Sequence, residues 1–423
     1  MVSESTQAKA GPRRKLRLGM VGGGQGAFIG GVHRIAARLD GRYELVAGAF
    51  SSTPERSKAS GVELGVAPER CYASFAEMAE REAALGDDRI DVVSIVTPND
   101  VHYPAAREFL TRGFHVICDK PLTTNLADAQ ALARLVEETG QIFVLTHNYT
   151  GYPMIRQARA MVAEGQLGTI RVVQAEYAQD WLTTKLEDTG QKQAAWRVDP
   201  VRSGPAGCTG DIATHAMNLA CFVTGLDLDS LAADLTAFVP GRLLDDNTHV
   251  MLRFAGGAKG MLWASQVAPG NENGLRLRVY GDKGGLTWAQ EDPNYLHFAP
   301  YGEPPRLIRR GGAGANAAAG RVTRVPAGHP EGYLEGFATI YNDAAELISA
   351  RIEGREPEAG GDLPTVADGV AGVAFIGAVV ESSRRDGAWV PARPAETAAA
   401  SHMAGSGHSP HYTNLPGIYL TQG

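Results

Sequence analysis

The sequence predicts an α/β protein in two parts: an N-terminal parallel sheet flanked by helices, and a C-terminal α/β part with a large, open, mostly antiparallel sheet. Up to about residue 150, short apolar runs alternate with helix-like segments, as in βαβ units. Beyond residue 151, strand-like runs take a period of two, as in Leu275, Leu277 and Val279. Such alternation indicates an antiparallel sheet with one packed face.

The first strand, residues 17–21, ends in a cluster of glycines. Gly22 suits a tight turn, Gly24 allows a pyrophosphate to approach the backbone, and Ala27 lets the next helix pack closely. We expect residues 28–31 to lengthen this loop, a helix through residues 33–39 and a second strand at 43–50. This βαβ unit predicts a dinucleotide-binding turn, and the alternative is a purely structural glycine turn.

The second strand ends without the acidic residue that many NAD-binding units use to hold ribose hydroxyls. Ser51 and Ser52 follow it, and Arg56 comes soon after. Arg56 can accommodate a 2′-phosphate, which favours NADP. The two serines can equally bind an unphosphorylated ribose, with Arg56 a solvated helix residue. We expect NAD and leave NADP open.

Later strands of the first part also end in polar residues. Ligands of open parallel sheets bind beyond the carboxyl ends of the strands, so these residues are expected to share one rim. The alternative for Asn99 and His102 is an ordinary role at a helix start, such as capping. The peptide bond between Lys120 and Pro121 can be cis or trans, and the sequence leaves this open. The strands and the segments after them are residues 90–96 with Thr97, Pro98, Asn99 and His102, residues 114–118 with Asp119 and Lys120, and residues 142–145 with His147, Asn148 and Tyr149.

The second part contains a candidate catalytic helix. Residues 210–219 are expected to form a capped helix that places Asp211 and His215, four residues apart, on one face. A histidine suits proton transfer near neutral pH, and a neighbouring carboxylate can orient its ring. The alternative is a helix cap beside an ordinary buried histidine. The strands expected around this helix are residues 170–177, 234–239, 249–254, 259–266 and 275–280.

Composition limits the function classes. The chain has 423 residues, 44% of them hydrophobic, and a net charge of −7. This charge argues against a nucleic-acid partner. We find neither a run of about 20 apolar residues nor the apolar core of a signal peptide, so we expect a cytoplasmic protein with no membrane partner. The four scattered cysteines predict free thiols and no metal site.

We divide the chain into a flexible tail (1–14), a dinucleotide-binding domain (15–150), a substrate-binding and oligomerisation domain (151–393) and a second flexible tail (394–423). The last helix before residue 393 is expected to pack back on the first domain. An open sheet with an apolar free face predicts a homodimer or homotetramer. His402, His408 and His411 in the second tail can bind a metal weakly or simply belong to a tail.

Four motifs in order resemble the Gfo/Idh/MocA family of NAD(P)-dependent sugar and cyclitol oxidoreductases, over residues 15–392. They are Gly22-x-Gly24, Thr97-Pro98-Asn99-x-x-His102, Asp119-Lys120-Pro121 and Gly210-Asp211-x-x-x-His215. The chain departs from the family in its long glycine turn, in Asp119 for the usual Glu and in the missing acid after strand two.

The resemblance implies a Rossmann domain followed by an α/β domain with an open antiparallel sheet, and a small-molecule sugar, glycoside or cyclitol substrate between them. By resemblance Lys120, Asp211 and His215 are catalytic: His215 as base, Lys120 as donor to the reacting oxygen, Asp211 orienting the substrate or His215. Implied cofactor contacts are Gly22, Gly24, Gln25, Ala27, Phe28, Ile29, Ser51, Ser52, Arg56, Thr97, Pro98, Asn99, His102, Asp119, Lys120, Asn148, Trp196 and Arg197. Implied substrate contacts are Lys120, Tyr149, Trp181, Arg197, Asp211 and His215.

Several interpretations stay open. Trp196 and Arg197 can be structural, and residues 329–333 can form a loop that closes over the substrate or an ordinary loop-to-helix junction. The leading function is dehydrogenation of a secondary alcohol. The alternatives are redox-neutral glycoside cleavage through transient oxidation, and a non-catalytic cofactor-binding sensor on the same fold.

Overall fold

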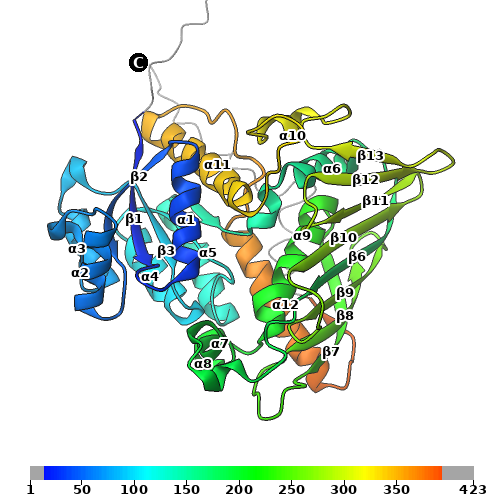
Figure 1. Cartoon of the computed structure of the whole chain (residues 1–423), viewed down its shortest axis with the longest axis horizontal. Coiled ribbons are helices and arrows are strands. Elements are labelled where there is room, and N and C mark those ends of the chain that lie inside the picture. The colour runs from blue at the N-terminus through cyan, green and yellow to red at the C-terminus, as the bar shows by residue number, and fades with distance from the viewer. Residues whose placement is uncertain (1–13, 393–423) are drawn as a thin grey trace, which may run out of the picture.

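Two β-sheets organise the part of the chain that the computed structural model describes, residues 14–392 (Figure 1). The histidines of the second tail, residues 402, 408 and 411, lie outside it. The N-terminal sheet is parallel, in the order β2-β1-β3-β4-β5. Its elements are β1 (Leu16–Gly22), α1 (Phe28–Leu39), β2 (Tyr43–Ala49), α2 (Pro54–Glu63), α3 (Phe75–Ala83), β3 (Val92–Val96), α4 (His102–Leu110), β4 (His115–Cys118), α5 (Leu126–Thr139) and β5 (Phe143–Leu145).

The strand order reverses at β1, whose neighbours are β2 on one side and β3 on the other. At such a switch point the connections leave in opposite directions and open a crevice at the carboxyl ends of the strands. The glycine turn after β1 and the segment after β3 border this crevice. The segments after the parallel strands therefore lie along one edge of the sheet, as predicted.

Helix α1 begins at Phe28, so the expectation of a longer loop at residues 28–31 is wrong. Gly30, in the first helical turn, packs directly on the glycine turn, because a Cβ added there would lie 2.3 Å from Cα of Gly23. This close contact fits the early start of the helix. Ala27 is the N-cap residue and provides no side-chain cap.

The C-terminal sheet has the order β13-β12-β11-β10-β6-β9-β8-β7-β14. Its neighbours pair antiparallel except β6 and β9, which are parallel. The strands are β6 (Ile170–Ala178), β7 (Leu228–Thr236), β8 (Asn247–Phe254), β9 (Lys259–Ser265), β10 (Gly274–Gly281), β11 (Gly284–Ala289), β12 (Tyr295–Pro300), β13 (Arg306–Arg309) and β14 (Val390–Pro391).

One strand was predicted at the wrong place, because residues 234–239 span only the end of β7. The strand stops at Thr236 since the next backbone N–H groups turn to the carboxylate of Asp246. Phe238 N and Val239 N donate to its two oxygens at 2.8 and 3.0 Å. A side chain has replaced the sheet partner there.

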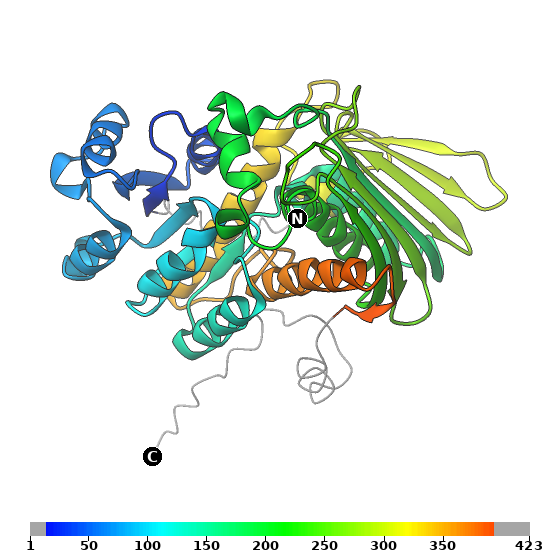
Figure 2. The ribbon, with the colours of Figure 1, turned by 90° about the horizontal axis from the view of Figure 1, so that it is seen from below.

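Helices cover the inner face of the large sheet and join it to the parallel sheet. α6 and α9 pack on the large sheet, and α11 packs on α1 of the parallel sheet. α12 contacts both α5 and β7, and Figure 2 shows it in orange beside the sheet edge. The helices are α6 (Pro153–Ala163), α7 (Lys192–Arg197), α8 (Pro200–Ser203), α9 (Thr214–Thr224), α10 (Ala317–Arg321), α11 (Tyr333–Glu353) and α12 (Val366–Arg384).

Two helices, α11 and α12, thus pack on the first domain, where we expected one. By length and composition α12 is apolar enough to cross a membrane, and half of its most apolar stretch is buried in the protein. The four cysteines are free thiols, as expected.

Candidate active site

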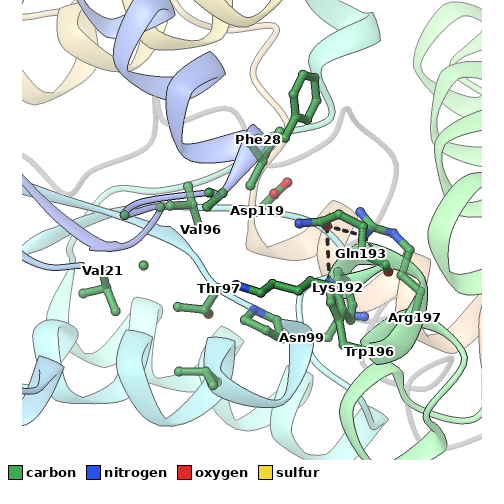
Figure 3. Close-up of a pocket in the computed structure, with 18 of the residues that line it drawn as sticks. Val21, Phe28, Val96, Thr97, Asn99, Asp119, Lys192, Gln193, Trp196 and Arg197 are labelled. Carbon is green, nitrogen blue, oxygen red and sulfur yellow. Dashed lines mark hydrogen bonds between the residues drawn. The ribbon is translucent and has the colours of Figure 1, made fainter. Parts of the chain in front are cut away.

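A pocket of about 1030 Å³ runs from the glycine turn, along the carboxyl edge of the parallel sheet, to α9. Figure 3 shows part of its lining. The pocket exceeds the 300–1,000 Å³ typical of drug-sized ligands. It is lined by every predicted site residue except His102. These are Gly22, Gly24, Gln25, Ala27, Phe28, Ile29, Ser51, Ser52, Arg56, Thr97, Pro98, Asn99, Asp119, Lys120, Asn148, Tyr149, Trp181, Trp196, Arg197, Asp211 and His215.

His102 does not line the pocket, which corrects its predicted role as a cofactor contact. The ring is fully buried, and its two nitrogens lie 2.8 Å from Pro121 O and 3.0 Å from Thr97 O. The histidine therefore connects the segment after β3 to the segment after β4. Its place in the motif is explained by this link between two loops.

The glycine turn lines the pocket and leads directly into the N-terminus of α1. Gly22 has φ of +82°, which suits the predicted tight turn. Gly24 meets the protein more closely than expected, because a Cβ there would lie 2.6 Å from Phe50 O and Ser60 Oγ. The first turn of α1 has neither a side-chain cap nor an acidic residue. Its free N–H groups suit an anion.

Two buried polar atoms in the pocket have no hydrogen-bond partner among residues 14–392. They are Oγ1 of Thr97 and Nδ2 of Asn148. Buried polar groups are nearly always paired, so these two fit a ligand that supplies the partners. Two carboxylates line the pocket: Asp119, which follows β4, and Asp211, which precedes α9. Among the described residues, no carboxylate lines the end of the pocket at the glycine turn. The residues present fit an anionic dinucleotide.

Asp211 lies at the centre of an ionic cluster. Lys120 Nζ is 3.1 Å from Oδ1, Arg197 Nε is 3.1 Å from Oδ2, and Gln266 Nε2 donates to Oδ2 at 2.8 Å. Burial would raise the pKa of Asp211, but the charges of Lys120 and Arg197 outweigh it and hold this pKa well below its usual range. The carboxylate thus fixes both cations and makes no hydrogen bond to His215.

Lys120 follows β4, and its peptide bond to Pro121 is cis. Its backbone N–H donates to Asp119 Oδ1 at 2.9 Å, and Thr146 Oγ1 donates to the same oxygen. Asp119 thus holds the segment that carries the lysine.

His215 lies in the first turn of α9, directly after a π-helical turn, Thr209–Ala213, that carries Asp211. The expected single α-helix over residues 210–219 is therefore interrupted. Asp245 holds the turn, because its carboxylate accepts hydrogen bonds from Gly207 N, Thr209 N and Thr209 Oγ1. The wider turn keeps Asp211 and His215 from pairing as an i, i+4 face would.

His215 is 7% exposed, with Tyr149 at its edge at 4.9 Å between ring centroids. Burial and the charge of Lys120 lower the pKa of His215 well below its ordinary value. Its Nδ1 lies 3.4 Å from Nδ1 of His147, a buried residue that our sequence analysis did not assign to the site. A neutral imidazole beside an ammonium can accept a proton from a bound hydroxyl.

Helices α7 and α8 close the pocket from the second part of the chain. Arg197 lies 4.3 Å over the ring of Trp196 and 5.9 Å from that of Trp181. Asn99 Nδ2 donates to Ser203 O at 3.0 Å and ties this segment to the rim of the parallel sheet. In Figure 3, Lys192 extends from α7 toward Thr97.

Sequence reasoning missed several lining residues. They are Gln179, Lys192, Gln193, Tyr177 and Asn273. They lie in α7 and at or beside the ends of β6 and β10, where no motif marks them. Tyr333, from the segment 329–333, also lines the pocket. Tyr333 begins α11, and the segment before it is tied down by a buried ion pair of 2.9 Å between Arg310 and Glu331. Residues 329–333 therefore form a loop-to-helix junction.

Two family descriptions match the chain: an oxidoreductase family with an NAD-binding Rossmann fold at residues 16–158, and a GFO/IDH/MocA C-terminal domain at residues 155–287. An uncharacterised oxidoreductase of Bacillus subtilis, YfiI, is 37% identical over 89% of this chain and 97% of its own length. The chain belongs to the Gfo/Idh/MocA family. It is an NAD-dependent oxidoreductase.

Solved structures agree with this family membership. An oxidoreductase from Sinorhizobium meliloti is 58% identical with a TM-score of 0.81, over 89% of this chain and all of that one. An inositol dehydrogenase homologue from Azotobacter vinelandii, complexed with NADH and myo-inositol, is 36% identical with a TM-score of 0.83, over 89% of this chain and 98% of that one. The family thus includes members that bind NADH and a cyclitol in this fold.

Proposed function

We propose that this protein oxidises a secondary hydroxyl of a cyclitol, sugar or glycoside, with His215 as the base and Lys120 as donor to the reacting oxygen. The observation that carries the proposal is the convergence of Lys120, Asp211 and His215 at one end of a pocket whose other end is the glycine turn. The myo-inositol complex of the Azotobacter vinelandii homologue supports a polyol. The aromatic faces of Tyr149 and Trp181 suit such a ring.

The chemistry follows from these positions. A bound nicotinamide would supply the acceptor for the hydride of the carbinol carbon. As the hydride leaves, His215 accepts the hydroxyl proton, because burial and Lys120 keep its ring neutral. Lys120, held by Asp211, donates to the same oxygen and stabilises its developing negative charge. Arg197 stays fixed between Asp211 and two indole rings, so that it can orient the neighbouring hydroxyls.

Variants of the two central residues test the proposal. We expect His215→Ala and Lys120→Ala to lower kcat about 10²- to 10⁴-fold, because each removes a group that acts on the reacting oxygen. Binding of NAD should persist in both, since the glycine turn is unchanged. His297→Ala and Lys283→Ala, exposed positions outside the pocket, are the matched controls. Unchanged turnover in the pocket variants would refute the assignment.

The assay of NADH formation also distinguishes the two alternative functions, redox-neutral glycoside cleavage and cofactor sensing. Cleavage of a glycoside without accumulation of NADH would indicate a redox-neutral reaction. Cofactor binding without conversion of any polyol would indicate a sensor.

A further inference from the structure

Two buried imidazole rings meet edge to face beside the pocket. His147, which follows β5, is 2% exposed, and His215 on α9 is 7% exposed. Their Nδ1 atoms are 3.4 Å apart and the ring planes cross at 82°. His215 lines the pocket and His147 does not. The ring of His147 therefore lies beside the pocket without lining it, and it contacts His215, which does.

A hydrogen bond between the two Nδ1 atoms requires a proton on one of them. Burial lowers the pKa of His147 to about 3, with the charge of Lys120 acting in the same direction. Burial and Lys120 also lower the pKa of His215. Two neutral imidazoles carry one N–H each, so a hydrogen bond between the two Nδ1 atoms has a donor on one side and an acceptor on the other. The direction of this bond decides which tautomer His215 presents to the pocket.

We propose that His147 is a positioning residue that accepts the Nδ1–H of His215 and so leaves Nε2 of His215 unprotonated for the substrate hydroxyl. The proposal rests on the dehydrogenase function above. In the reaction the hydroxyl proton passes to Nε2 of His215 while hydride leaves the carbon for the nicotinamide. His147 gains no proton; its Nδ1 continues to accept the Nδ1–H of the imidazolium that forms.

The donors already in the site favour this direction. Lys120 supplies an N–H to the reacting oxygen, so the proton of that hydroxyl needs an acceptor. Both oxygens of Asp211 are held by Lys120, Arg197 and Gln266. The opposite tautomer would place a second donor beside Lys120 and leave the hydroxyl proton unpaired. Charged or titratable groups around the two rings are Asp119, Lys120, Asp211, Tyr149 and Tyr177.

Nitrogen-15 spectra of the histidine rings test the proposal without any substrate. In the wild type with NAD bound, we expect the proton of His215 on Nδ1, with the signals assigned by comparison with His215→Gln. A proton on Nε2 in the wild type would overturn the proposal. This readout stays valid if the protein oxidises no polyol, so failure of the proposed function is distinguished from failure of the tautomer assignment.

Two variants give an independent kinetic test. His147→Asn places an oxygen acceptor near the position of Nδ1, whereas His147→Leu removes the acceptor at similar volume. We expect His147→Leu to lower kcat about 10²-fold with KM and the Kd for NAD little changed, and His147→Asn to keep kcat within about tenfold of the wild type. The Leu variant should also shift the His215 proton to Nε2.

Circular dichroism of both variants separates misfolding from a chemical effect. If His147→Leu misfolds, the positioning role of His147 is still tested by the kcat of His147→Asn relative to the wild type and by the nitrogen-15 spectra of the wild type. Wild-type kcat in a folded His147→Leu, or equal loss in a folded His147→Asn, would contradict the positioning role.

Discussion

Arg56 lines the pocket beside Ser51 and Ser52, where the ribose of the adenosine half would lie, and its guanidinium donates to Gln25 O at 3.3 Å. We expect Arg56→Ala to raise KM for NADP about tenfold or more, because a charge-assisted bond to a 2′-phosphate is lost. KM for NAD should change little. Lys58→Ala on the same helix, outside the pocket, is the control. Parallel increases for both cofactors would contradict this role.

Four buried histidines, His33, His115, His147 and His215, have lowered pKa values and make stability depend on pH. The pKa values of His33 and His115 are lowered to about 4 and that of His147 to about 3, in each case mainly by burial. Between these values and 6.5, the unfolded chain binds protons that the folded chain does not. Stability therefore falls as pH drops from 6.5 toward 4, by up to about 1.4 kcal/mol per pH unit for each histidine. Urea unfolding at pH 7 and pH 5 measures it, and equal stability at both would contradict the burial.

At the residue scale, every site residue predicted from the sequence except His102 lines the pocket. Many of them follow parallel strands, whose carboxyl ends meet at one edge of the sheet. It misassigned His102 because a motif does not reveal whether a ring faces a pocket or two backbone carbonyls. It listed His147 among the rim residues and gave it no role. That role depends on a contact across 68 residues of chain.

At the scale of elements, the glycine turn and α1 depend on one close contact. A Cβ at Gly30 would meet Cα of Gly23 at 2.3 Å, whereas at Gly31 the nearest atom is 4.0 Å away. We expect Gly30→Ala to destabilise the protein and weaken NAD binding at least tenfold. Gly31→Ala should stabilise α1 by up to about 1 kcal/mol, because alanine favours helix interiors. Thermal unfolding and NAD titration measure both, and equal effects of the two substitutions would refute this packing.

Element boundaries were harder to predict than elements. The start of α1 depends on Gly30 fitting against Gly23, and the end of β7 depends on Asp246. The π-helical turn at Asp211 depends on Asp245, which is distant in sequence. Each boundary is set by a tertiary contact that overrides local pattern.

At the scale of the whole molecule, the large sheet leaves one face uncovered. Met251 and Met261 pair across β8 and β9 and are 54% and 59% exposed, and Val172 and Tyr280 are also exposed. We propose that a second copy covers this face, as a homodimer or homotetramer. Light scattering after gel filtration should give a multiple of the chain mass. The double variant Met251→Glu with Met261→Glu should give a smaller species, and Tyr301→Glu should not. A monomeric wild type would contradict the proposal.

Hydride transfer from a polyol to a nicotinamide in this pocket is measured by the absorbance of reduced nicotinamide. Wild-type protein with NAD would be mixed in turn with inositols, sugars and glycosides, and with His215→Ala in parallel. We expect NADH to accumulate with at least one polyol in the wild type and to be lost in the variant. NAD binding without NADH from any of these compounds would contradict dehydrogenation of a polyol by this protein.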